Sequence, residues 1–108
     1  MLEKLTRPER LLLLQFLCAF AWTDLKVSDA ERRFVMKIVD RLGLDAEDTA
    51  QVEEWLSLAP APAALDPVSI PTGHRRLFLD TIRALVFTDG VDPEERESLE
   101  RLRRILGA

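Results

Sequence analysis

Cysteine, histidine and tyrosine are scarce in this 108-residue chain, which has one cysteine, one histidine and no tyrosine. A single cysteine excludes an intramolecular disulfide, and so few Cys and His residues exclude both a zinc site built from them and a Cys–His nucleophile pair. Cys18 lies in an apolar segment, so we expect it to be buried and unreactive. His74 stands beside Arg75 and Arg76, and we expect it to face solvent with no neighbour to orient it as a base.

A hydrophobic run long enough to span a membrane is also lacking. The longest one, LLLLQFLCAFAW at residues 11–22, is about 12 residues long, whereas a transmembrane helix needs about 20. Glu3 and Glu9 interrupt the basic start of a signal peptide, and no small-residue cleavage site follows the run. We therefore expect a cytoplasmic protein without a transmembrane segment or secretion signal.

The chain also lacks a large excess of charge of either sign. Charged residues make up 31% of the chain, yet the net charge is only -4, which excludes a broad basic surface for nucleic acid. The segment after residue 92 is rich in arginine, but glutamates alternate with the arginines at spacings of three and four. Pairs such as Glu97–Arg101 and Glu100–Arg104 predict a solvated helix face rather than an RNA or lipid site.

Helix start and stop signals divide the chain into five predicted helices and indicate an all-α fold. Thr6 with Glu9, and Ser28 with Glu31, have the spacing at which an N-cap hydroxyl and an N3 carboxylate exchange hydrogen bonds with each other's backbone amides. Gly43 can supply a left-handed C-cap. The first predicted helix runs from about Arg7 to Trp22, and the second from the Ser28 cap to Leu42. The third begins at Asp45 and includes Val52, Trp55 and Leu56. The fourth lies in the segment HRRLFLDTIRALVFTDG, and the fifth runs from the Asp92 cap to Leu106.

Two of these helices are predicted to form the centre of the fold. The first is apolar on nearly every face, and the fourth is its counterpart, with apolar residues on several faces. The second and fifth helices each have one apolar stripe, and the shorter third helix should cover the core rather than form it. We expect six residues of the first and fourth helices to meet: Phe16, Leu17, Phe20, Phe78, Ile82 and Leu85.

The connector between the third and fourth helices, SLAPAPAALDPVSIP, contains four of the six prolines. Proline lacks the amide hydrogen and disfavours a helical residue before it, so this segment should be a loop. It also contains Leu58, Leu65, Val68 and Ile70, which predict an ordered loop packed against the protein rather than a linker. We therefore expect a single domain over residues 1–108, with a first hairpin at about 7–43, a middle helix and connector at about 45–71 and a second hairpin at about 72–107.

One pattern occurs twice in the sequence. Aligning Trp22–Gly43, WTDLKVSDAERRFVMKIVDRLG, with Phe87–Gly107, FTDGVDPEERESLERLRRILG, pairs Glu31 with Glu95 and leaves one residue fewer in the second loop. Each copy is a buried helix, a short acidic loop and a capped amphipathic helix. Because one hairpin is too small to bury its own apolar face, two hairpins paired about a pseudo-twofold axis would form the core.

This duplicated order, an aromatic residue, an Asp-Gly turn and a capped helix that ends in Leu-Gly, resembles the TerB-like family. That family includes the tellurite-resistance protein TerB and a domain of DjlA-type membrane co-chaperones. The resemblance extends over about Arg7 to Gly107 and implies a bundle of about five helices, stress-linked or membrane-peripheral complexes, and metal binding, with no established catalytic residues. The first copy departs from the pattern because Leu25 stands where the second has Gly90.

Acidic residues gather in the two loops of the repeated pattern. Asp24 lies in the first loop, Asp89 and Asp92 lie in the second, and Glu31 and Glu95 stand at the helix starts. Oxygen donors of this kind suit a hard divalent cation such as calcium, but neither loop has the ligand spacing of an EF-hand. Helix capping is the stronger interpretation for the two glutamates, and turn formation for Asp24 and Asp89. One weak cation site at the second loop remains as a hypothesis.

No pair of residues forms a recognisable nucleophile and base, and the chain has no glycine-rich phosphate loop. We expect no catalytic residues, no enzymatic activity and no cofactor. We interpret the chain as a non-catalytic TerB-like interaction or scaffold domain with a protein partner, in a bacterial stress response or at the membrane periphery. Two alternatives stay open: a metal-responsive module that uses the acidic loops, and an enzyme subunit whose active site needs a partner.

Overall fold

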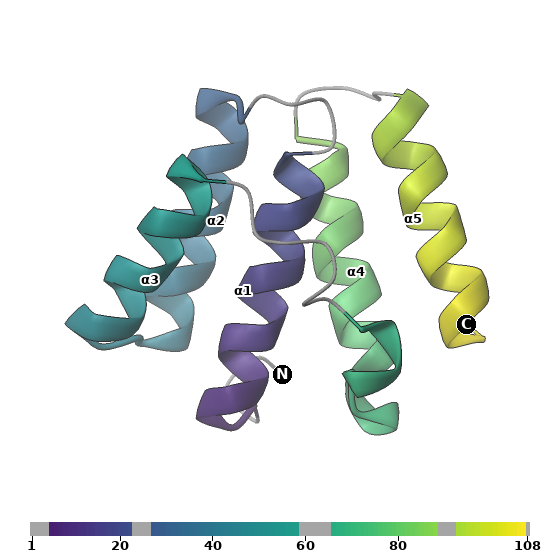
Figure 1. The fold of residues 1–108 in the computed structure, drawn as a ribbon, viewed down its shortest axis with the longest axis horizontal. Coiled ribbons are helices and arrows are strands. Elements are labelled where there is room, and N and C mark those ends of the chain that lie inside the picture. Colours follow the sequence, from purple (N-terminus) through teal and green to yellow (C-terminus); the bar gives the residue numbers. More distant parts are fainter. Residues whose placement is uncertain (1–4, 23–26, 59–65, 89–92, 108) are drawn as a thin grey trace.

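The computed structural model describes residues 5–22, 27–58, 66–88 and 93–107 as a compact all-α protein with a Cα radius of gyration of 12.7 Å. These residues contain the five predicted helices (Figure 1). Two short 3₁₀ turns, η3 (Pro67–Ser69) and η4 (Thr72–His74), precede the fourth helix. The α-helices are α1 (Arg7–Ala21), α2 (Asp29–Leu42), α3 (Ala46–Ser57), α4 (Arg75–Val86) and α5 (Pro93–Leu106).

The helix starts follow the predicted capping signals. At α1 the Glu9 amide donates to the Thr6 hydroxyl over 3.4 Å, and the Thr6 amide donates to the Glu9 carboxylate over 2.8 Å. At α2 the Glu31 amide donates to Ser28 Oγ over 3.1 Å, and the Ser28 amide donates to Glu31 Oε1 over 3.0 Å. Both capping boxes are confirmed, because each pair satisfies two amides that the helix itself leaves unbonded.

Glycine ends α2 as expected. Gly43 has a φ of 65°, in the left-handed region where a side chain would strain the backbone, and its amide donates to the carbonyls of Val39 and Asp40. The chain can therefore turn sharply into α3, which begins when the Asp45 carboxylate accepts the Asp48 amide over 2.8 Å.

Helices α1 and α4 pair at the centre of the molecule. Figure 1 shows them side by side and running in the same direction, with α3 at one side of the molecule and α5 at the other. The rings of Phe16 and Phe78 meet edge to face across this pair, with centroids 6.4 Å apart. The predicted contact is confirmed for Phe16 and Phe78, and all six predicted residues are buried in one core cluster: Phe16, Leu17, Phe20, Phe78, Ile82 and Leu85.

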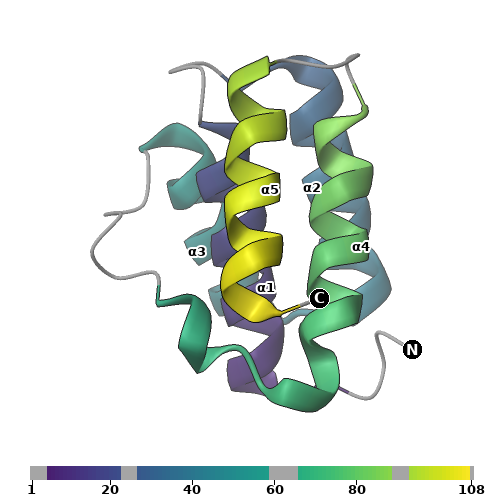
Figure 2. The same cartoon turned by 90° about the vertical axis from the view of Figure 1, so that its right-hand side faces the viewer.

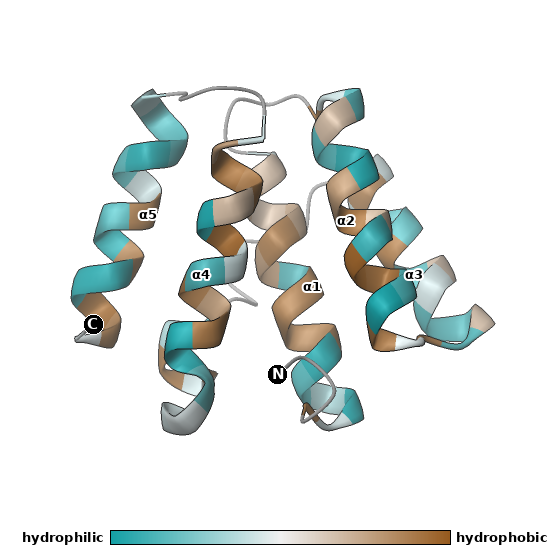
Figure 3. Ribbon diagram, turned by 180° about the vertical axis from the view of Figure 1, so that it is seen from behind, coloured by the Kyte–Doolittle hydropathy of each residue, from teal (hydrophilic) through white to brown (hydrophobic). Residues whose placement is uncertain are grey.

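The two central helices differ in how much of their surface is covered. Helix α1 packs against α2, α3 and α4, and its apolar surface is brown along most of its length in Figure 3. None of the described helices is long and apolar enough to cross a membrane. Helix α4 packs against α1 and α5 and also contacts α2, but it leaves Arg76, Asp80 and Arg83 exposed. The expectation that α4 is apolar on several faces was wrong, because these three residues follow one another at helical spacing on a single polar face.

The connector packs less completely than its composition indicates. Ile70 is buried, but Leu58 and Val68 are each 69% exposed, so the expectation that all of these side chains pack is wrong for those two. The η3 turn contacts α5, which holds this part of the connector against the second hairpin. Leu65 lies outside the described residues.

Candidate functional site

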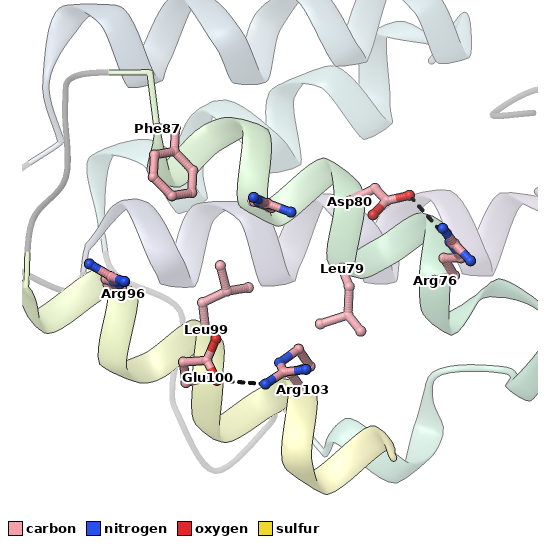
Figure 4. Close-up of a pocket in the computed structure, with 9 residues that line it drawn as sticks. Arg76, Leu79, Asp80, Phe87, Arg96, Leu99, Glu100 and Arg103 are labelled. Carbon is pink, nitrogen blue, oxygen red and sulfur yellow. Dashed lines mark hydrogen bonds and ion pairs between the residues drawn. The ribbon is translucent and has the colours of Figure 1, made fainter. Parts of the chain in front are cut away.

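A groove of about 500 Å³ lies between α4 and α5, the two helices of the second hairpin. Figure 2 shows these helices side by side on one face of the molecule. In the close-up, Leu79 and Leu99 both lie between the two helices, and charged side chains lie on either side of them (Figure 4). The lining residues are Arg76, Leu79, Asp80, Arg83 and Phe87 from α4 and its C-cap, and Arg96, Leu99, Glu100 and Arg103 from α5.

Helical spacing explains why these side chains share one groove. On α4 each lining position lies three or four residues from another lining position, and the same holds on α5. Such positions form a single stripe along a helix. Because α4 and α5 are packed together, the two stripes form facing walls. The buried side of each helix lies next to its stripe, so Leu79 and Leu99, which are 8% and 9% exposed, join the groove to the core.

The groove is locally positive in a protein whose net charge is negative. Four arginines and two carboxylates line it, whereas the whole chain has a net charge of -4. The Arg103 guanidinium donates to Glu100 over 2.9 Å, and this hydrogen bond lowers the pKa of the Glu100 carboxyl. Arg76 reaches Asp80 at 4.0 Å, with both side chains largely in solvent. Both carboxylates of the groove therefore already have arginine partners.

Arg83 and Arg96 are the two groove arginines without such a partner. No ion pair within 4.0 Å joins either one to a carboxylate among the residues that the structure describes, and Arg96 affects Glu100 only through its charge, which contributes to the lowered pKa of that carboxyl. The Arg83 guanidinium lies over the ring of Phe87, 5.6 Å from its centroid, and Phe87 is 45% exposed. This cation–π contact holds Arg83 beside an exposed aromatic ring. The groove can therefore bind an anionic group and an apolar side chain next to each other.

The structure describes only two of the five predicted metal ligands, Glu31 and Glu95. Asp24, Asp89 and Asp92 lie outside the described residues. Glu31 is buried in the capping box of α2, and Glu95 is 4% exposed on the core side of α5. Among the described residues there is no group of three or more His, Cys, Asp or Glu side chains that could hold a metal ion. The cation site therefore stays a prediction about the second loop.

The single histidine is placed differently from the expectation. The His74 side chain is only 27% exposed, and its Nε2 lies 3.6 Å from Oε2 of Glu9, which belongs to the capping box of α1. The expectation of a solvent-facing side chain without a neighbour was wrong, because the turn before α4 places it against the start of α1. Cys18 is buried as expected, and burial raises the pKa of its thiol to about 12, which keeps it protonated at neutral pH.

Sequence reasoning treated the arginines of α5 as a plain solvated face and did not find the groove. It predicted an ion pair between Glu100 and Arg104, whereas the structure joins Glu100 to Arg103; the predicted Glu97–Arg101 pair is confirmed at 3.7 Å. One signal was present in the sequence. Arg76 and Arg83 are seven residues apart, as are Arg96 and Arg103, and this spacing repeats a position on the same helix face.

Comparison with known proteins adds no relative: no protein family, no curated protein and no solved structure matches this chain.

Proposed function

We propose that this chain is a non-catalytic, TerB-like interaction domain, a bundle of two pseudo-symmetric helix hairpins that binds a protein partner. The sequence support is the duplicated pattern described above. The structural support is that α1 packs against α2, α4 packs against α5, and α1 and α4 pair between them. This arrangement agrees with the two hairpins that the duplication predicts.

The observation that carries the interaction role is the groove between α4 and α5. It combines an exposed aromatic ring, two arginines without carboxylate partners and a leucine floor in one concave surface. Aromatic and arginine side chains are the types that contribute most of the binding energy at protein interfaces. No described residue of the groove is a nucleophile with an adjacent base, so binding is the chemistry that the groove supports.

The resemblance to TerB-like proteins directs the proposal to a bacterial stress response, in the cytoplasm or at the membrane periphery. A test in cells uses a photo-crosslinking amino acid at Phe87 in the groove and, as a control, at Lys37, which is exposed on α2. We expect a discrete protein adduct from position 87 and none from position 37, during growth with tellurite or an oxidant. No adduct at position 87 under either stress would contradict the interaction role.

A growth assay tests the link to stress separately. Cells that lack this chain should grow less well on tellurite than cells that carry it, and wild type should restore growth better than a variant with Arg83 and Arg96 both changed to Glu. If both proteins restore growth equally, the groove has no part in the stress response.

A further inference from the structure

The wall of the groove on α4 has a counterpart on α1. The alignment that pairs Trp22 with Phe87 also pairs Leu14 with Leu79 and Cys18 with Arg83. On both helices these positions form one stripe, because they are separated by four or eight residues. The two hairpins can therefore be compared by the element that packs over this stripe in each of them.

In the first hairpin the stripe is covered by α3. The Arg7 guanidinium, at the start of the same stripe, donates to both carboxylate oxygens of Asp48 over 2.9 Å, and this pairing lowers the pKa of Asp48. At the other end, Trp22 Nε1 donates to the Trp55 carbonyl of α3 over 2.8 Å. Between these two contacts, Leu14 and Cys18 are completely buried.

In the second hairpin α5 lies beside the equivalent stripe and Leu79 is buried, but the described residues place no counterpart of α3 over the rest of it. Arg83 stands where α1 has the buried Cys18, and it is exposed. Phe87 stands where α1 has Trp22, and it is 45% exposed. The stripe from Arg76 to Phe87 is about 16 Å long at 1.5 Å per residue, which matches a helix of about three turns.

We propose that the groove between α4 and α5 receives an acidic amphipathic helix from a partner protein, seated on the second hairpin as α3 is seated on the first. This inference rests on the interaction role proposed above and names the chemistry of the partner. Helix α3 is itself acidic on its exposed side and apolar on its buried side, and it is anchored by an arginine of the helix that it covers. Arg83 and Arg96 provide the same kind of anchor for carboxylates of the incoming helix, and Leu79, Leu99 and Phe87 receive its apolar side chains.

The observations favour a helix of another protein over two other occupants. A second copy of this chain cannot offer α3, because Val52 and Leu56, on its apolar face, are already buried in their own core. An anionic membrane is a poor fit because the groove is concave, and because the protein as a whole has a net charge of -4.

The test uses the sequence of α3 as a defined acidic helix supplied in trans. The probe is a capped peptide of residues 45–58, DAEDTAQVEEWLSL, and its counterpart has Lys in place of every Asp and Glu. Binding is measured by fluorescence anisotropy on the full chain, and the site is located from amide chemical shifts. We expect saturable binding of the acidic peptide alone, with shifts in α4 and α5. Equal binding of both peptides, no binding, or shifts centred on α1 would overturn the proposal.

Charge variants locate the anchor. Changing Arg83 and Arg96 together to Glu should weaken peptide binding at least about tenfold, because two charge-assisted hydrogen bonds are lost. Changing Arg33 and Arg41, which are exposed on α2, to Glu alters the net charge equally and should leave binding unchanged. Equal weakening in both variants would show that only net charge matters and would overturn the proposal. Arg83→Gln with Arg96→Gln gives the same test with less repulsion if the reversed variant unfolds.

Two further measurements exclude the other occupants. Sedimentation of the free protein should show a monomer, and co-sedimentation with phosphatidylserine vesicles should show no binding that depends on Arg83 and Arg96. A dimer or vesicle binding that is lost in the Arg83→Glu, Arg96→Glu variant would assign the groove to that occupant instead. An adduct at Phe87 in cells combined with failure of the acidic peptide would retain the interaction role and reject only the acidic helix.

Discussion

The two hairpins, α1 with α2 and α4 with α5, differ most in how their first helices are used. Both first helices lie at the centre, but α1 has packing partners on three sides, whereas α4 has a charged face that borders the groove. The difference follows from α3, which lies against α1 and lets its sequence, LLLLQFLCAFA, be apolar almost throughout. In α4, arginine occupies positions equivalent to Leu11 and Cys18. A repeated local pattern therefore yields a covered surface in one half and an open surface in the other.

The largest expected effect is a loss of stability on truncating a core residue, and it tests whether α4 is as central to the fold as α1. Leu85 of α4 is completely buried in the core, so Leu85→Ala should lower the free energy of unfolding by about 2 to 5 kcal/mol. Urea denaturation followed by circular dichroism measures this loss. Leu79→Ala, at the edge of the groove, is the matched control and should cost less. A loss below about 1 kcal/mol for Leu85→Ala would mean that α4 is peripheral rather than central.

Trp22 and Phe87 stand at equivalent positions in the two hairpins. Replacing each of them tests whether only the first hairpin is covered by a further helix. Trp22→Ala should cost about 2 to 4 kcal/mol, because it removes packing under α3 and leaves the Trp55 carbonyl without its donor. Phe87→Ala should cost about 0.5 to 1 kcal/mol, mainly through loss of the exposed contact with Arg83. Equal costs in the same denaturation experiment would show that both stripes are covered to the same extent.

Acid should destabilise the α1–α3 junction more than the groove. The pKa of Asp48 is lowered by its hydrogen bonds to Arg7, and that of Glu100 by its hydrogen bond to Arg103. A carboxyl whose pKa is lower in the folded state stabilises the protein above its unfolded pKa, about 4, and this stabilisation is lost as the pH falls through the folded pKa. The Asp48 side chain is 8% exposed and that of Glu100 is 44% exposed.

Asp48→Asn should therefore remove more of the fall in melting temperature between neutral and acidic pH than Glu100→Gln does. Thermal denaturation across this pH range measures both variants against wild type. A larger change in the Glu100 variant would reverse the expected order of the two ion pairs.

The smallest expected effect concerns the two acidic loops. The first has Leu25 and Lys26 after Asp24 in the sequence, whereas the second has Gly90 after Asp89 and Asp92 three residues further on, so we expect a cation to bind only at the second. We predict no calcium binding, or one site at the second loop with an affinity no tighter than about 10⁻⁴ M. Calorimetry on metal-free wild type and Asp89→Asn measures it. Micromolar binding that disappears in the variant would favour the metal-responsive alternative, and two sites per chain would show that Leu25 makes no difference.

Local signals in the sequence determined the helices of this protein. The capping boxes at Thr6 and Ser28 and the C-cap at Gly43 join residues no more than four positions apart, so their geometry depends little on the rest of the chain. Apolar spacing likewise identified residues of α1 and α4 that are buried in the core, among them Phe16 and Phe78, whose rings meet. These features were predicted correctly because each depends either on hydrogen bonds within one or two helical turns or on the apolar face of a helix, which is buried away from water.

Tertiary structure alone decided which faces stay open. The Arg7–Asp48 pair joins residues 41 positions apart, and the bond from Trp22 to Trp55 spans 33, so neither could be found from local spacing. Whether an arginine stripe is merely solvated or forms the wall of a groove depends on which helix packs beside it. The four groove arginines became one site only because α4 and α5 bring their stripes face to face, while the helix that covers the equivalent stripe lies on the other hairpin.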